Sequence, residues 1–275
     1  MIKILNKLVI KSGINQKFFV SLYRLYFNII NYIKYRDPYM FRIVAIEISS
    51  YCNRKCSYCP VSKETEKIPK MFMEIDLFKK IIKQLQDINF NGSIMYHFYN
   101  EPLLDERLPE FISYVDANLP KCNSRVFTSG DFLTPHLADS LFNAGLHDMV
   151  ITDHNLKPGR VEKRIAPILD KYGDKISINR LYDRPILNRG GAVEVADLEK
   201  NKKGNCTVVY EELNITYTGD VLLCSSDYHR SKVYGNINEK NILDIYNNDD
   251  YVKARKSIIS GEPYYDICVD CNYFQ

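Results

Sequence analysis

The stretch IVAIEISSYCNRKCSYC, residues 43–59, carries the pattern that decides the fold. It opens with an apolar run of strand character and ends in three cysteines, Cys52, Cys56 and Cys59, spaced Cys-x3-Cys-x2-Cys. Three thiolates on one tight loop can ligate three irons of a 4Fe–4S cluster and leave the fourth iron open to a chelating molecule. The sequence therefore predicts an iron–sulfur centre just after a strand.

Other uses of cysteine fit this spacing less well. A structural zinc site usually shows Cys-x2-Cys pairs and needs a fourth ligand. A disulfide framework is typical of short secreted chains, whereas this chain has 275 residues and begins without a secretory segment. Reduced, metal-ligating cysteines predict a cytoplasmic protein.

Four of the other five cysteines form a second set. Cys206 and Cys224 flank a predicted hairpin, and Cys268 and Cys271 form a Cys-x2-Cys pair close to the last residue. Taken alone, this set would also suit a zinc ribbon. Beside the first triplet we expect a second 4Fe–4S cluster, whose closed set of four thiolates suits electron transfer. The eighth cysteine, Cys122, is expected to be an inert, apolar residue.

The composition, with 45% hydrophobic and 26% charged residues, is that of an ordinary globular protein. Residues 1–40 form a basic, aromatic extension with seven Lys or Arg residues and one Asp, which gives them a charge of +6. Because the formal net charge of the whole chain is +3, residues 41–275 carry −3. Residues 18–33 read as a helix, but Arg24 and two asparagines interrupt its apolar residues, so a membrane span is not expected. We expect this helix to pack on the main domain, with peripheral contact at the inner membrane face as the alternative.

From residue 43 onward, strand-like runs alternate with helical stretches, which predicts a parallel sheet with crossover helices. The fold class expected is α/β, a partial (β/α)6 TIM-like barrel over 41–182, whose ligands gather at the carboxyl ends of the strands. Residues 183–275 are expected to form a small C-terminal cluster domain. The strands are predicted at 43–49, 93–99, 125–128, 149–153 and 176–179, and the hairpin at 208–216 and 221–223. Helices are predicted at 73–85, 108–117, 135–144 with Thr134 as N-cap, 158–172 and 242–259.

Residues 43–271 resemble the radical S-adenosylmethionine (SAM) superfamily, in the members that carry a shortened cluster domain of the SPASM or twitch type. The resemblance rests on the cysteine spacings and on HFYNEPLL (97–104), TSGDFLT (128–134) and NRGG (188–191). Within the family, the members that oxidise an aminocyclitol alcohol are the most similar. The resemblance implies SAM, two 4Fe–4S clusters, a small carbohydrate-like substrate and a one-electron reductant such as flavodoxin or ferredoxin, with no nucleic acid.

The resemblance also implies roles for single residues. SAM contacts are implied at Tyr58, Asn100, Glu101, Pro102, Ser129, Gly130 and Asn188, although Asn100 stands where the family usually has glycine. Arg189 is implied beside the substrate hydroxyl; because arginine is effectively always protonated, it would act by acidifying that hydroxyl. Tyr99 is the second candidate catalytic residue, whereas His97 is expected in the core. Thr152, His154, Phe127 and Ser226 are expected in the substrate pocket, and the last two depart from the polar contacts of the family, so a different substrate molecule is expected.

The expected reaction is oxidation of a secondary alcohol of a carbohydrate or aminocyclitol to a ketone, with the second cluster accepting an electron. An epimerase of a sugar or peptide would need a cysteine to return hydrogen, and Cys122 precedes its strand, at the wrong end of a barrel. A SPASM-type peptide maturase often carries a leader-peptide-binding domain longer than the 40-residue head. A regulatory iron–sulfur protein would need neither an open iron nor the SAM-contacting stretch.

Overall fold

The computed structural model describes residues 16–35, 37, 39–64, 69–154, 159–181, 186–195 and 206–272, and the chain divides into two compact units, Met1–Phe41 and Arg42–Gln275. In the first unit, helix α2 (Gln16–Tyr35) covers the predicted helix 18–33. Its exposed large apolar side chains follow a helical spacing: Leu22, Leu25, Tyr26, Ile29, Tyr32 and Ile33. None of the helices in the described part of the chain combines the length and hydropathy that a membrane crossing needs. The basic residues Lys3, Lys7 and Lys11 lie outside the described residues.

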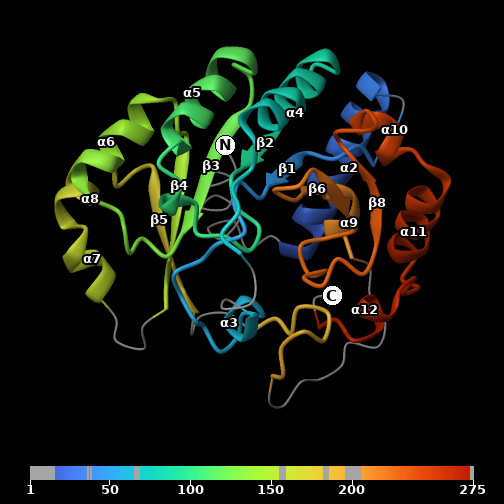
Figure 1. The fold of residues 1–275 in the computed structure, drawn as a ribbon. Coiled ribbons are helices and arrows are strands. Elements are labelled where there is room, and N and C mark those ends of the chain that lie inside the picture. The colour runs from blue at the N-terminus through green and yellow to red at the C-terminus, as the bar shows by residue number, and fades with distance from the viewer. Residues whose placement is uncertain are drawn as a thin grey trace. The chain divides into compact units, whose positions relative to one another are not determined.

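The second unit is built on one eight-stranded sheet in the order β5-β4-β3-β2-β1-β6-β7-β8 (Figure 1). Neighbouring strands from β5 to β6 are parallel, and β7 and β8 add antiparallel strands at the edge. This confirms the predicted α/β class with five parallel strands in chain order. The strands are β1 (Ile43–Ile46), β2 (Ser93–Met95), β3 (Asn123–Thr128), β4 (Asp148–Asp153), β5 (Ile176–Arg180), β6 (Glu212–Ile215), β7 (Asp220–Leu222) and β8 (Val233–Asn236).

Helices cover the outer side of the parallel strands (Figure 1). Helix α4 shows why: its apolar residues recur at helical spacing and bury one face, from Leu77 to Leu85, against the sheet. The predicted N-cap is confirmed, since Thr134 Oγ1 accepts a hydrogen bond from Leu137 N at 3.1 Å. The helices here are α3 (Val61–Glu64), α4 (Ile75–Asp87), the short 3₁₀ helix η1 (Pro102–Leu104), α5 (Leu108–Asn118), α6 (Pro135–Asn143), α7 (Arg160–Arg164) and α8 (Ala166–Tyr172).

The C-terminal part differs from the prediction in two places. The predicted strand 208–216 was wrong at its start, because α9 (Val208–Glu211) is a helical turn and β6 begins only at Glu212. The predicted helix 242–259 is two helices, α10 (Ile242–Tyr246) and α11 (Asp249–Ile259), because the Asn248 side chain accepts from Tyr251 N at 2.8 Å and starts a new helix. A short helix, α12 (Asp266–Val269), carries Cys268.

Three predicted elements in the barrel also differ, the first being the strand 43–49, which ends at Ile46. The strand 93–99 ends at Met95, because Asn100 closes a tight loop: its Nδ2 donates to Tyr96 O at 3.2 Å and its Oδ1 accepts from Phe98 N at 3.0 Å. The helix 158–172 is divided at Ile165, after which α8 restarts with a proline in its first turn. Residue 158 itself lies outside the described residues.

Glu47, which follows β1, is a buried carboxyl whose titration should be visible in stability. It is 4% exposed, its Oε2 lies 3.4 Å from a nitrogen of Arg230, and burial raises its pKa to about 7, against that ion pair. A raised pKa favours the folded state at low pH, so the contribution is full below the unfolded pKa and is lost as pH rises to about 7. Between pH 5.5 and 7 this loss is roughly 2 kcal/mol.

We therefore expect Glu47→Gln to remove that part of the pH dependence. Urea unfolding of the anaerobic protein at pH 5.5 and pH 7.5 measures it: the difference in unfolding free energy between the two pH values should shrink by about 2 kcal/mol in the variant. An unchanged difference would contradict the assignment.

Candidate active site

The carboxyl ends of the parallel strands open into a cavity of about 460 Å³. Residues from the cysteine loop after β1 and from the ends of β2, β3, β4 and β5 line it together. Of the predicted site residues, those lining it are Cys52, Cys56, Cys59, Tyr58, Tyr99, Asn100, Glu101, Phe127, Ser129, Thr152, His154 and Arg189. The cavity thus brings the predicted cluster loop, SAM stretch and substrate residues to one place.

The cysteine loop is held to the loop that follows β3 by a bidentate ion pair. Arg54 Nε and a terminal guanidinium nitrogen donate to the two carboxylate oxygens of Asp131, each at 2.6 Å. Asn53 Nδ2 donates to the same carboxylate at 3.1 Å. Burial acts to raise the pKa of Asp131, but the bonds from Arg54 and Asn53 lower it overall. Asp131 therefore fixes the position of the three-cysteine loop against the sheet.

Glu101 joins the ends of β2 and β3 through its side chain. Its carboxylate accepts from Thr128 Oγ1 at 2.5 Å, from Ser129 N at 2.8 Å and from Leu103 N at 3.2 Å. With these donors in place, the part of the predicted SAM stretch that is available to a ligand is its backbone. Pro102 and Gly130 do not line the cavity. Pro102 is the first residue of η1, and Gly130 lies in a turn with a φ of +71°.

Tyr58 and His154 meet at the edge of the cysteine loop. The Tyr58 hydroxyl and His154 Nδ1 are hydrogen-bonded, and their rings stack with centroids 5.9 Å apart. His154 Nδ1 also lies 3.9 Å from Cys56 Sγ. Burial lowers the pKa of His154 to about 4, so the imidazole is neutral at physiological pH. His154 therefore lies beside the cluster loop.

Arg189 enters the cavity from a tight loop in which three consecutive residues have positive φ: Arg189 (51°), Gly190 (61°) and Gly191 (90°). Asn188 holds this loop, since its Nδ2 donates to Asp270 O at 2.5 Å and its backbone N donates to Asn272 Oδ1 at 2.9 Å. Asn188, predicted to contact the cofactor, does not line this cavity and instead binds the segment around the last cysteine pair. Burial raises the pKa of Cys59, and the guanidinium of Arg189 opposes that rise. Burial and Arg189 together lower the pKa of His97, so the charge of Arg189 acts on two residues that line the cavity.

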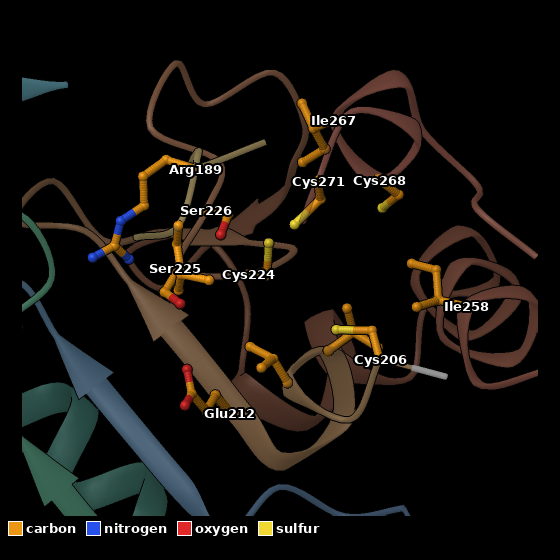
Figure 2. A pocket seen from close by; sticks show the side chains of 13 residues that line it. Arg189, Cys206, Glu212, Cys224, Ser225, Ser226, Ile258, Ile267, Cys268 and Cys271 are labelled. Atoms are coloured by element: carbon orange, nitrogen blue, oxygen red, sulfur yellow. The ribbon is translucent and has the colours of Figure 1, made fainter. Parts of the chain in front are cut away.

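A second cavity, of about 200 Å³, is lined by all four cysteines of the second set, Cys206, Cys224, Cys268 and Cys271 (Figure 2). Burial raises the pKa of Cys206 to about 11, while backbone N–H groups of Val208 and Val209 act against that rise. None of the eight cysteines, all of which lie among the described residues, forms a disulfide. Four thiols around one small space, with amide donors aimed at sulfur, fit a 4Fe–4S cluster held by four protein ligands. Ser226, predicted in the substrate pocket, lines this smaller cavity.

The two cavities share part of their lining: Leu187, Arg189, Glu212 and Ser225. Tyr99 reinforces this junction, because its hydroxyl donates to Ser225 O at 2.7 Å. Burial raises the pKa of Tyr99 well above its usual range, so it stays neutral and its role here is positional. The predicted substrate region and the predicted cluster site are therefore direct neighbours.

Sequence reasoning missed two residues of β6 that line the larger cavity, Glu212 and Asn214. They stand two apart on a strand and so share a face, opposite Ile43 and Ala45 of β1. Both polar atoms of the Asn214 side chain, and Nδ1 of His97, are buried without a hydrogen-bond partner among the described residues. Buried polar atoms of this kind call for a ligand or water. The sequence signal that could have identified them is the two-residue spacing of Glu212 and Asn214, two polar residues within a mainly apolar predicted strand.

Cys122 lies where the sequence predicted. It is 3% exposed, directly precedes β3 at the amino end of the sheet, and its Sγ donates to Phe90 O at 3.4 Å. It is therefore separated from the cavity at the carboxyl ends.

Comparisons with known proteins agree with this geometry. Residues 46–181 match the family model of the radical SAM superfamily, and residues 206–272 match the SPASM model, an iron–sulfur cluster-binding domain. The chain is 31% identical over 236 residues to the S-adenosyl-L-methionine-dependent 2-deoxy-scyllo-inosamine dehydrogenase of Niallia circulans, which covers 85% of this chain and 93% of the relative.

Two further known proteins match this chain, one over most of its length and the other over less than half of it. A crystal structure of BtrN in complex with AdoMet and 2-DOIA matches with a TM-score of 0.75 and 30% identity, over 85% of this chain and 93% of that chain. The GTP 3',8-cyclase of a Sulfurovum species is 30% identical over 119 residues, 41% of this chain and 34% of the relative.

Proposed function

This chain belongs to the radical SAM superfamily, and from that premise we propose that it oxidises a secondary alcohol of an aminocyclitol or a related carbohydrate to a ketone. The observation that carries the proposal is the lining shared by the two cavities. A dehydrogenation must remove an electron from the substrate after hydrogen abstraction, and a cluster site adjoining the substrate cavity suits that step. Its similarity to a 2-deoxy-scyllo-inosamine dehydrogenase over 85% of its length supports the substrate class.

The proposed ligands follow from the two sets of thiols. Cys52, Cys56 and Cys59 would hold the SAM-binding cluster, and Cys206, Cys224, Cys268 and Cys271 the auxiliary cluster. When bound, SAM and the two clusters supply a hydrogen-abstracting 5'-deoxyadenosyl radical and an acceptor for one electron. The reducing electron would come from an external one-electron carrier such as flavodoxin or ferredoxin.

The protein's own contribution is to bind, orient and enclose. Arg189 offers a positive charge in the lining of the cavity, where it would bind the substrate hydroxyl and stabilise negative charge on its oxygen. Tyr99 holds the junction through Ser225, and Thr152 and Phe127 line the remaining substrate space. The unpartnered amide of Asn214 is available to a substrate hydroxyl or amine.

The test is anaerobic reconstitution with iron and sulfide, followed by incubation with SAM, a strong reductant and candidate aminocyclitols. Matched amounts of 5'-deoxyadenosine and a product lighter by two hydrogen atoms are expected. 5'-Deoxyadenosine with a product of unchanged mass would indicate an epimerase instead, although Cys122, buried before β3, is poorly placed to return hydrogen.

Asp131→Asn is expected to loosen the three-cysteine loop, because it weakens the bidentate pair with Arg54. Residues that support metal ligands typically contribute 10- to 100-fold to metal affinity, so a chelator should remove iron from the first cluster about tenfold faster. The matched control is Asp148→Asn, which breaks a similar bidentate pair with Arg125 (2.6 and 2.8 Å) at the amino end of the sheet. Equal iron loss in both variants would show that the Asp131 effect is only general destabilisation.

We also propose that α2 binds the surface of an anionic bilayer. Its exposed stripe, including Leu25, Ile29 and Ile33, lies in a segment that carries seven basic residues against one acidic residue. Apolar insertion together with lysine and arginine attraction is the combination that holds interfacial helices on membranes. Co-sedimentation with vesicles rich in phosphatidylserine is expected, with loss of binding in Leu25→Asp/Ile29→Asp and on neutral vesicles. Equal binding by the variant would contradict the proposal.

A further inference from the structure

We propose that Glu212 is the residue that accepts the proton of the substrate hydroxyl, and that Arg189 and Glu212 act as a pair at the junction of the two cavities. This inference rests on the proposed function and adds a catalytic residue to it. Arg189 cannot itself accept a proton, because a guanidinium remains protonated in proteins. Oxidation of an alcohol to a ketone therefore requires another group in the cavity.

The placement of Glu212 meets this need. It is the first residue of β6 and lines both the substrate cavity and the smaller cavity, as Arg189 does. Figure 2 shows its carboxylate on the side of the cavity where Ser225 and Arg189 lie, away from Cys268 and Cys271. The carboxylate makes no hydrogen bond to any described residue, so its oxygens are available to a ligand.

The other proton acceptors that line the substrate cavity are already occupied or too weakly basic. Glu101 accepts three hydrogen bonds from Thr128, Ser129 and Leu103. His154 Nδ1 is already hydrogen-bonded to the Tyr58 hydroxyl. Burial and the charge of Arg189 lower the pKa of His97 to about 4, so it would not hold the proton at neutral pH. Glu212 is the acceptor that remains among the histidine and carboxylate groups of this lining.

The charges around Glu212 suit reversible proton transfer. Burial and the neighbouring Glu211 raise its pKa to about 7, and Arg189 opposes this rise. From α11, the Tyr251 hydroxyl also faces this region, and its own pKa is raised by burial and, to a smaller extent, by Glu212. A carboxyl that titrates near the working pH can both take a proton and release it, which is the requirement for an efficient general base.

In the proposed oxidation, Glu212 takes the proton that the substrate hydroxyl loses. The carbinol C–H bond breaks with transfer of a hydrogen atom to the deoxyadenosyl group. The O–H bond then breaks, and its proton passes to the Glu212 carboxylate. The auxiliary 4Fe–4S cluster, held by the four cysteines of the second set, would serve as the oxidant that accepts the remaining electron, and the carbon–oxygen double bond would form.

The experiment compares Glu212→Gln with the matched control Glu211→Gln in the fully loaded enzyme. Glu211 is the adjacent carboxylate, but it pairs with Arg42 at 2.8 Å and lines neither cavity. Loss of a general base typically costs 10²- to 10⁴-fold, so Glu212→Gln should lower ketone formation at least about 100-fold while 5'-deoxyadenosine formation falls less than about threefold. Glu212→Asp, which keeps an acid, should retain intermediate ketone formation, and iron content and SAM binding check that each variant is folded.

A second readout does not depend on turnover. The infrared measurement uses the resting, loaded enzyme without SAM in a Glu47→Gln background, because Glu47 is a second buried carboxyl with a pKa of about 7. In that background the C=O band of a protonated carboxyl should disappear with a midpoint near pH 7, and it should be missing from Glu212→Gln but present in Glu211→Gln. Ketone formation at the wild-type rate by Glu212→Gln, or a band that survives this substitution, would overturn the inference. Failure of the wild-type enzyme to form any ketone would instead refute the proposed function, so the two failures are distinguishable.

Discussion

Cys56→Ala is expected to abolish 5'-deoxyadenosine formation entirely. The substitution removes one of the three thiols that the loop presents to the larger cavity, and a cluster with two protein ligands cannot present a stable open iron to SAM. The second set of thiols lines a different cavity and should still bind its cluster. Iron analysis after anaerobic reconstitution should therefore give about four irons per chain in the variant against about eight in the wild type.

The control for this prediction is Cys122→Ala. Cys122 is also a free thiol, but it is buried at the amino end of β3 and lines neither cavity. We expect full iron content and normal 5'-deoxyadenosine formation, with a loss of about 1 kcal/mol in stability from the small void. Iron loss in Cys122→Ala as large as that in Cys56→Ala would show that cysteine removal acts through folding.

Arg189→Met is expected to lower ketone formation by about 10³-fold, because a preorganised charge at the site where negative charge develops typically contributes 10²- to 10³-fold or more. The charge of Arg189 opposes the rise that burial causes in the pKa values of Cys59 and Glu212, so it acts electrostatically on both sides of the cavity. Iron content should not change. Product and 5'-deoxyadenosine, quantified from the same reaction, measure the effect.

Arg180→Met provides the contrast. Arg180 also lines the larger cavity, but its guanidinium is paired with Glu162 at 2.6 Å, so its charge is largely balanced. We expect a change of less than about tenfold, mainly in KM. A loss of ketone formation as large as that in Arg189→Met would mean that the cavity needs positive charge in general rather than Arg189 at its position.

Much of the fold could be predicted because local patterns coincide with long-range structure in a parallel sheet. Each of the first four barrel strands is an apolar run followed by a helical pattern, and Thr134 followed by proline marks a helix start without reference to anything distant. The errors came where side chains override local propensity. Asn100 ends β2 by binding its own loop, and Asn248 restarts a helix within a continuous helical pattern.

The candidate site was predictable to the extent that its residues belong to recognisable motifs. The cysteine sets and the stretch from Tyr99 to Glu101 were identified by spacing and resemblance, and they line the two cavities. Glu212 and Asn214 belong to no motif, and their place depends on the pairing of β6 with β1, which no local pattern encodes. Asn188 was assigned to the cofactor through the family resemblance, whereas in the structure its side chain contacts Asp270 and its backbone contacts Asn272.

The pairing of β6 with β1 also has a consequence for synthesis on the ribosome. The register pairs Ile43 with Glu212 and Ile46 with Ile215. Because β1 is synthesised early, it lacks its second neighbouring strand through most of translation. A parallel strand that lacks a neighbour exposes unpaired N–H and C=O groups, and contacts of such long sequence separation form slowly. The nascent barrel therefore exposes an unpaired edge of β1, which can pair with other chains, until β6 has been synthesised. Chains truncated before residue 206 should need chaperones or aggregate, and slow decoding in the hairpin should lower the yield of active enzyme.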